Sequence, residues 1–336
     1  MDPNAERNKS IIDVSPLKHN VFNNNYVSNL VNEPKKMNDN PLVSILLLSM
    51  NHERFIEQCI SSLEEQTYKN IEILYLDNAS SDKTLDVGKK ALEKSGISHK
   101  IFSNAESKGI SENLNFLFKN STGKYLVTLS TDDWLTQDSV EEKVKYFNHH
   151  PEFGMVYNSA FSYNYDTKKK FVCAKKNKFK QGWVFKDILK ENFICTTGCM
   201  IKRNTLETVG NFDENSLIED WDMWIRIAEK FPIGLVNKEL AYYGVKEGNN
   251  ITGDMEYMNR GFDYILKKYA HCEGIEETKK FVDRINTYYY ATNQPSVKTL
   301  LLILRNYRFN LFYLKQTVKI ILGIFKKKIL AQKVYG

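Results

Sequence analysis

Two adjacent aspartates, Asp132 and Asp133, follow an apolar run at residues 125–129. Two carboxylates side by side in a partly buried crevice repel each other and lose hydration, so a positive group normally lies beside them. Their hard oxygen atoms suit Mg²⁺ or Mn²⁺, which bind one or two carboxylates and complete their shells with water and substrate phosphates. Acidic residues also favour the first turn of a helix. The pair therefore predicts either a divalent-cation site or a helix start.

The segments that must position this pair alternate between two patterns. Amphipathic segments, such as residues 84–95, predict helices. Short apolar runs predict buried strands of a parallel sheet, at residues 42–48, 71–76, 100–102 and 125–129. This β-α-β order with short connections is typical of a Rossmann-like nucleotide-binding half. No Gly-x-Gly-x-x-Gly occurs in it, which argues against a dinucleotide cofactor.

Polar side chains follow three of these predicted strands. The carboxyl ends of parallel strands meet at one edge of a sheet, where open α/β sheets bind ligands. Side chains there can hydrogen-bond a base and a ribose, while a cation holds a diphosphate. Taken singly, each group is more readily explained as a turn or an Asx cap. A nucleotide site is predicted by their convergence: Ser49 and Asn51, Asp77 and Asn78, Asp132 and Asp133.

Composition divides the chain of 336 residues into three parts. Residues 1–40 contain ten asparagines and three prolines with little hydrophobic periodicity, which predicts a flexible N-terminal arm. Residues 41–250 carry the α/β pattern and are long enough for one large domain. Residues 251–336 read as helical and predict a C-terminal extension that ends in a basic amphipathic segment at residues 311–325.

The positive charge of the chain is concentrated in its tail. The net charge is +6, and the part after Asp283 holds ten basic residues and no acidic one, so the rest is net negative. This distribution argues against a nucleic-acid groove on the main domain. The charge-free apolar run at residues 320–325 is too short to span a bilayer. We expect the tail to lie on an anionic membrane surface; docking on a partner subunit is the alternative.

The cysteines and the N-terminus bear on the compartment. Five widely spread cysteines suit a reducing compartment better than a disulfide framework. Cys195 and Cys199 lack a second Cys/His pair and do not predict a zinc site. No apolar signal-peptide core follows the N-terminus. We therefore expect a cytoplasmic protein, which the basic tail would hold on the inner face of the cell membrane.

Four stretches, in this order and spacing, resemble the family 2 inverting glycosyltransferases of the GT-A fold, of the bacterial surface-polysaccharide type. The resemblance covers most of residues 41–250, and it implies a Rossmann-like, mostly parallel sheet flanked by helices. The stretches that carry it are residues 43–51, residues 76–84, the Ser-Thr-Asp-Asp-Trp block at residues 130–134, and Ile-Glu-Asp-Trp-Asp-Met-Trp at residues 218–224.

The resemblance implies a role for each matching residue. Asp77 would read the nucleotide base with help from Ser49 and Asn51, and Asn78 and Lys108 belong to the same donor-binding set. Asp132 would approach the ribose and share with Asp133 the binding of Mn²⁺ or Mg²⁺. The sequence also departs from the family, because Ser130 and Asn78 stand where many members carry acids. Ser130 leaves fewer protein ligands for a metal, and both departures weaken the expected metal affinity.

A second acidic group, Glu219 and Asp220, precedes a predicted helix. A sugar hydroxyl that attacks an anomeric carbon must lose its proton, which a carboxylate within hydrogen-bond reach can accept. With the family resemblance we assign this role to Asp220, and Glu219 joins the catalytic group because its adjacent charge makes Asp220 a stronger base. The alternative is a helix N-terminal carboxylate.

Two further positions complete the expectations. The family often places a histidine near residue 246, where Lys246 stands here; a lysine cannot ligate a metal while charged, but it can neutralise the departing diphosphate. Trp183 and Phe185 are expected to pack in the core, because aromatic residues dominate cores.

Together these features predict an inverting, metal-assisted transfer of a sugar from a nucleoside diphosphate sugar, UDP-linked, to a hydroxyl of a saccharide or lipid-linked saccharide acceptor. One alternative is a nucleotidyltransferase acting on a sugar phosphate, which leaves Asp220 without a role. The other is a non-catalytic saccharide-binding protein derived from the family, which Ser130 and Lys246 make conceivable.

Overall fold

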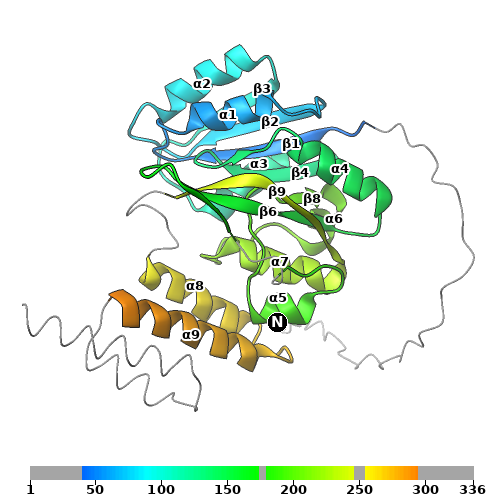
Figure 1. Ribbon diagram of the computed structural model, residues 1–336, viewed down its shortest axis with the longest axis vertical. Coiled ribbons are helices and arrows are strands. Elements are labelled where there is room, and N and C mark those ends of the chain that lie inside the picture. The colour runs from blue at the N-terminus through cyan, green and yellow to red at the C-terminus, as the bar shows by residue number, and fades with distance from the viewer. Residues whose placement is uncertain (1–39, 174–178, 246–253, 294–336) are drawn as a thin grey trace, which may run out of the picture. The chain divides into compact units, whose positions relative to one another are not determined.

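The computed structural model describes residues 40–173, 179–245 and 254–293 of the chain (Figure 1). Three expectations therefore lie outside the described residues. They are the N-terminal arm apart from its last residue, the position of Lys246, and the basic amphipathic segment at residues 311–325. The described residues contain the predicted sheet and the first two helices of the C-terminal extension.

The first four strands form the parallel half that the apolar runs predict. They lie side by side in the order β3-β2-β1-β4, with every neighbouring pair parallel. In this register Ser49 pairs with Asp77, and Ser130 pairs with Leu48, so the carboxyl ends of three strands meet at one edge. The strands are β1 (Val43–Ser49), β2 (Ile71–Asp77), β3 (Ser98–Ser103) and β4 (Tyr125–Ser130).

The second half adds short antiparallel pairs to the mostly parallel sheet. Strand β8 pairs antiparallel with both β4 and β6, β5 and β7 are also antiparallel to their partners, and only β6 and β9 are parallel. The antiparallel pairs bring later segments back across the edge where β4 ends. These strands are β5 (Trp134–Leu135), β6 (Met155–Asn164), β7 (Lys170–Val172), β8 (Met200–Lys202) and β9 (Ile233–Val245).

One face of the sheet is covered by α1, α2 and α4. Successive residues of β1 point to opposite faces, so Val43, Ile45 and Leu47 pack with these helices, whereas Leu46 packs on the other side. Helix α2 ends at Gly96, whose φ of 67° is the left-handed conformation that glycine adopts without strain. The covering helices are α1 (Ile56–Glu64), α2 (Thr84–Ser95) and α4 (Ser139–His149).

The opposite face carries the remaining helices, and Figure 1 shows α5 and α7 between the sheet and the pair α8 and α9. Helix α7 is buried along most of its length, which explains its run of apolar residues. Asp254 caps α8 by accepting hydrogen bonds from the backbone N–H groups of Glu256 and Tyr257. The helices are α3 (Ile110–Asn120), α5 (Phe185–Lys190), α6 (Arg203–Val209), α7 (Glu219–Lys230), α8 (Met255–Lys268) and α9 (Ile275–Asn293).

One core expectation is wrong. Trp183 is 71 % exposed, although Phe185 is partly buried against the core as expected. The backbone of Gly182 forms an antiparallel bridge with Ile233, and in extended chain successive side chains face opposite ways. Val184 takes the inward position and leaves Trp183 outside. Among the described residues, no helix combines the length and apolarity that a membrane span requires.

Candidate active site

The turn after β4 holds Asp133 at the carboxyl edge of the sheet. Asp133 is only 6 % exposed, and both of its carboxylate oxygens accept hydrogen bonds. The Thr197 hydroxyl donates to Oδ2 at 2.6 Å, and the Gly244 N–H of β9 donates to Oδ1 at 2.8 Å. A Cβ at Gly244 would lie 2.1 Å from the Asp132 carbonyl oxygen. The close approach of β9 therefore requires glycine at this position.

The environment of Asp133 disfavours its charge. Burial, together with the neighbouring Asp132 carboxylate, raises the pKa of Asp133 well above its ordinary value. Asp133 does not begin a helix, because β5 follows it directly and α4 begins only at Ser139. The helix-start interpretation of this pair therefore does not hold.

Asp132 lies beside a histidine that the sequence alone did not single out. The Ser130 hydroxyl donates to Asp132 Oδ1, and His52 Nε2 lies 3.7 Å from Asp132 Oδ2. The other ring nitrogen of His52 is 2.8 Å from the Thr131 hydroxyl, which fixes the orientation of the ring. His52 follows the polar end of β1, so the rule that strand ends carry ligand groups could have identified it.

The carboxylate pair fits a weakly held divalent cation. Its donors are hard oxygens, and each Asp133 oxygen keeps lone-pair capacity beyond the hydrogen bond that it accepts. Within the described ranges, no three His, Cys, Asp or Glu side chains converge as a metal-binding group. An ion bound at Asp132 and Asp133 would therefore need the remaining ligands from water and from the phosphates of a substrate.

Asp77 and its partners form a second polar cluster at the same edge. Asp77 accepts hydrogen bonds from the hydroxyls of Ser49, at 3.0 Å, and Ser80, at 2.6 Å. Asn51 accepts from the backbone N–H of Ser81 at 2.9 Å, and both Asn51 and Ala79 have a φ of 56°. Such left-handed residues persist only where the surroundings hold them. The structure thus brings Ser49, Asn51 and Asp77 together in one cluster where the ends of β1 and β2 meet.

Asn78 and Lys108 have a different setting. The Asn78 amide donates to the Lys108 carbonyl at 3.0 Å and accepts from the Lys108 N–H at 2.9 Å, so it fixes the loop that leads into α3. The Lys108 ammonium pairs with Glu112 at 2.6 Å on the surface. Asn78 therefore holds backbone, and the Lys108 side chain is directed to α3.

Asp220 stands in the first turn of α7, and three donors orient its carboxylate. The Thr196 hydroxyl and the Asn192 amide donate to Oδ2 at 2.5 and 3.3 Å, and the Trp221 N–H donates to Oδ1 at 2.6 Å. Thr196 precedes Thr197, the donor to Asp133, so two consecutive hydroxyls reach the two carboxylates. Neither threonine was singled out from the sequence, although both lie where β8 is about to begin.

Asp133, Glu219 and Asp220 line one cavity of about 830 Å³. Burial and the charge of Asp220 raise the pKa of Glu219 to about 8. The residues predicted to bind the donor nucleotide are not among the described residues that line this cavity; they are Ser49, Asn51, Asp77 and Asn78. The structure therefore brings the two predicted acidic centres together and leaves the predicted base-reading cluster beside them.

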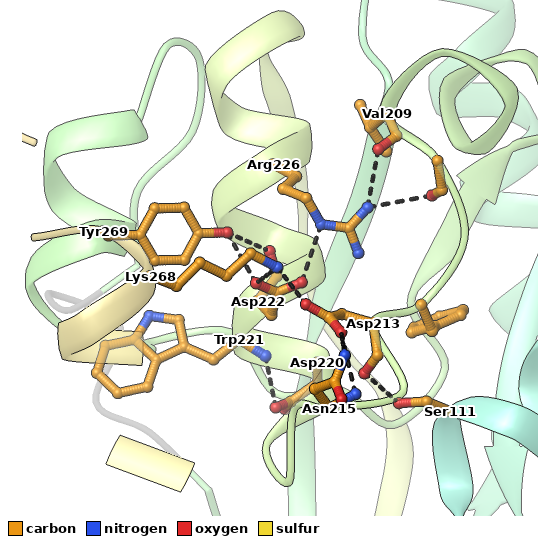
Figure 2. A network of polar contacts seen from close by, with 12 residues as sticks. Ser111, Val209, Asp213, Asn215, Asp220, Trp221, Asp222, Arg226, Lys268 and Tyr269 are labelled. Carbon is orange, nitrogen blue, oxygen red and sulfur yellow. Dashed lines mark hydrogen bonds and ion pairs between the residues drawn. The ribbon is translucent and has the colours of Figure 1, made fainter. Parts of the chain in front are cut away.

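Asp222, two residues after Asp220, faces the opposite way into a charge network (Figure 2). It is fully buried and accepts from Lys268 at 2.7 Å, Tyr269 at 2.8 Å and Arg226 at 2.9 Å. Lys268 also contacts Asp213, where this ion pair and the Tyr264 hydroxyl hold the pKa of the carboxyl well below its usual range despite burial. This network ties the start of α7 to the end of α8.

Comparisons with known proteins find similarity to glycosyltransferases. The model of the family described as "Glycosyl transferase family 2" matches residues 44–210. An uncharacterized glycosyltransferase of Haemophilus influenzae is 26% identical over 87% of this chain and 98% of its own length. The Escherichia coli enzyme named UDP-Glc:alpha-D-GlcNAc-diphosphoundecaprenol beta-1,3-glucosyltransferase WfgD is 29% identical over 59% of this chain and 74% of its own.

Among solved structures, TarS residues 1–349 of S. aureus in complex with UDP-GlcNAc aligns with a TM-score of 0.57 at 14% identity, over 83% of this chain and 79% of that chain. This likeness confirms the α/β fold with flanking helices. Of the three functions weighed from the sequence, the glycosyltransferase is the one that the family match confirms. Residues 44–210 of the chain form a glycosyl transferase family 2 domain, and the chain is a glycosyltransferase with the α/β fold of TarS.

Proposed function

We propose that the protein transfers a sugar, with inversion at the anomeric carbon, from a UDP-sugar to a hydroxyl of a saccharide acceptor, and that Asp220 is the general base. One observation carries this proposal. Asp220 and Asp133 line the same cavity, and consecutive threonines hold their carboxylates. A base for the acceptor and an anchor for the leaving diphosphate are thus provided side by side, which suits a direct displacement.

The residues of the chain divide the work. The hydrogen bonds from Thr196 and the Trp221 N–H orient the Asp220 carboxylate, which takes the proton of the attacking hydroxyl. The cluster of Ser49, Asn51 and Asp77 binds the base and ribose. Asn78 holds the backbone of Lys108 beside this cluster. Asp132 and Asp133 would hold Mn²⁺ or Mg²⁺, which supplies Lewis-acid compensation of charge on the diphosphate. Lys246 would add a positive charge there.

The UDP donor and the acceptor are supported by the relatives. WfgD carries a UDP-sugar donor and a diphosphoundecaprenol-linked acceptor in its name, and the aligned TarS structure contains UDP-GlcNAc. We extend both to this chain and propose a lipid-linked saccharide acceptor for surface polysaccharide synthesis at the inner face of the cell membrane. The basic residues after Asp283 would then contact anionic lipid.

The test is the substitution Asp220→Asn. It removes the base while keeping the shape of the side chain, so transfer should fall by about 10²- to 10⁴-fold. The affinity for UDP, measured by calorimetry, should stay within about threefold of the wild-type value, because Asp220 does not contact the cluster of Ser49, Asn51 and Asp77. UDP release from UDP-glucose and UDP-GlcNAc, with membrane extract as acceptor, reports transfer.

The matched control is Glu229→Gln, since Glu229 is an exposed acid on the same helix α7. Its UDP release should equal that of the wild-type protein. Wild-type-like turnover of Asp220→Asn would exclude Asp220 as the base. Absence of UDP release by the wild-type protein from both donors would contradict the proposed donor.

A further inference from the structure

The cavity that holds the two carboxylates continues into an apolar arm. On the side of the sheet its lining is polar, with Asp133, Thr196, Thr197 and Asp220. On the side of the C-terminal extension the lining comes from α3, α8, α9 and the segment before α7, and it is almost entirely apolar. The residues of this apolar arm are Leu114, Ile218, Met258, Phe262, Phe281 and Ile285.

Trp221 joins the candidate base to the apolar arm. Its backbone N–H donates to the Asp220 carboxylate. Its ring packs edge-on against the rings of Phe262 and Phe281, with centroid distances of 6.0 and 5.8 Å. The indole N–H is satisfied by the Ile188 carbonyl at 2.6 Å, so the ring offers only apolar surface to the cavity. Trp221 thus lies between the candidate base and a wall that is apolar apart from the Tyr257 hydroxyl.

We infer that the apolar arm binds the hydrocarbon chain of the acceptor, so that the acceptor is a saccharide head joined to a lipid and α8 and α9 form its chain-binding subsite. This inference rests on the proposed function, because it takes Asp220 as the place where the saccharide hydroxyl reacts. It assigns to the first two helices of the C-terminal extension a direct part in acceptor choice.

The chemistry of the wall disfavours a second sugar as its occupant. Sugar hydroxyls buried without partners lose hydration at a cost of a few kcal/mol each, and among the described cavity residues of α8 and α9 only Tyr257 carries a hydrogen-bonding side chain. Met258, Phe281 and Ile285 are only partly buried, so a chain that covers them removes further apolar surface from water. A cavity of about 830 Å³ is within the range of sites that enclose a ligand of several hundred daltons.

The apolar arm can be tested by binding alone, with dimethylallyl, geranyl and farnesyl phosphate as probes. These share one head group and differ only in chain length, and saturating UDP keeps them out of the donor site. Affinity, measured by calorimetry below the micellar range, should rise at least about tenfold from the five-carbon to the fifteen-carbon probe. Quenching of tryptophan fluorescence should follow the same order, because Trp221 borders the apolar arm.

The substitution Ile285→Asp should remove this dependence on chain length, since it places a charge against the chain. Met258→Gln, on α8, is a milder second variant for the case that the first does not fold. Tyr288→Asp is the matched control, because Tyr288 lies on the same helix as Ile285 but is 50 % exposed. It should bind the three probes as the wild-type protein does.

Several outcomes would overturn the inference. One is equal affinity for all three probes, as expected if residues 294–336 of the chain fill the apolar arm. Another is a dependence of affinity on chain length that survives substitution at both Met258 and Ile285. An equal loss in Tyr288→Asp would count against it as well. The Asp220→Asn protein separates the two proposals, because it should lose transfer and still distinguish the probes. Normal transfer without chain-length dependence would overturn this inference alone.

Discussion

Asp133 and Asp222 are both buried carboxylates, but they differ in whether a positive charge lies beside them. Asp222 is surrounded by its own countercharges, Lys268 and Arg226, and by the Tyr269 hydroxyl. Asp133 receives only the uncharged donors Thr197 and Gly244, and none of the described basic residues forms an ion pair with it. Burial therefore raises the pKa of Asp133 well above its ordinary value.

The difference separates a carboxylate whose charge is paired inside the protein from one that has no countercharge among the described residues. A buried charge that is fully paired inside the protein has no need of a further cation. A buried acid that lacks a countercharge destabilises the fold until a cation or a proton arrives, and such strained groups gather at functional sites. Asp220 and Asp222 repeat the contrast on one helix, because residues two apart face different sides.

The largest effect is expected for Lys268→Met, which removes the cation shared by Asp213 and Asp222. Breaking a buried ion pair leaves an uncompensated charge and typically costs about 3–5 kcal/mol. The free energy of unfolding, measured by urea titration, should fall by about this amount, and the C-terminal helices should loosen first.

Lys267→Met is the control, because Lys267 is exposed on the same turn of α8. Its free energy of unfolding should change by less than about 0.5 kcal/mol, as is usual for surface substitutions. If both variants lose the same stability, the Asp222 network does not stabilise the fold, and its contrast with Asp133 disappears.

The second prediction has the opposite sign. Asp133→Asn should stabilise the ligand-free protein at neutral pH, by about 1–2 kcal/mol. The pKa of Asp133 is raised in the folded state, so the wild-type protein loses stability as the pH rises above the ordinary value of an aspartate. The gain of the variant should therefore vanish in acid, where Asp133 is protonated in both states.

The same substitution should remove the stabilisation that Mn²⁺ and UDP together give the wild-type protein in thermal unfolding. A loss of stability in Asp133→Asn without ligand would show that Asp133 contributes structure, as Asp222 does. An unchanged response to Mn²⁺ with UDP would place the metal elsewhere.

Periodicity predicted the half of the fold in which helices and strands are local. Helix α2 has the predicted bounds, and β1, β2 and β4 differ from their predictions by one or two residues. The antiparallel pairing of β8 with β4 and the parallel pairing of β9 with β6 were not predicted, because long-range pairing leaves no periodic signal. Trp183 was wrongly predicted to be buried, since aromatic content says nothing about which side of a bridge a residue faces.

At the site, a strand end predicted Asp133 and the family resemblance predicted Asp220, but neither indicated the residues that orient these carboxylates. Thr196 and Thr197 come from a segment far along the chain, so only the tertiary fold shows that they reach Asp220 and Asp133. The apolar arm was equally hidden, because Phe281 and Ile285 look like ordinary helix core in the sequence. Residue types indicate which chemistry is possible, but sequence spacing indicates which residues lie together only within a single helix or strand.

Glu219 gives the smallest and most specific prediction, because it is an acid without a countercharge among the described residues, like Asp133, but lies beside the candidate base. Burial and Asp220 raise its pKa to about 8. When the pH rises through this value, the new charge beside Asp220 makes that carboxylate a stronger base. The rate of transfer should therefore rise by about two- to fivefold across this range.

In Glu219→Gln the charge never forms, so the step near pH 8 should be missing and the rate should stay at its lower level. Glu229→Gln, on the exposed side of the same helix, should keep the step. A pH profile of UDP release that is unchanged in Glu219→Gln would assign the step to another group. It would then place Glu219 with Asp222, as an acid that shapes α7 without taking part in proton transfer.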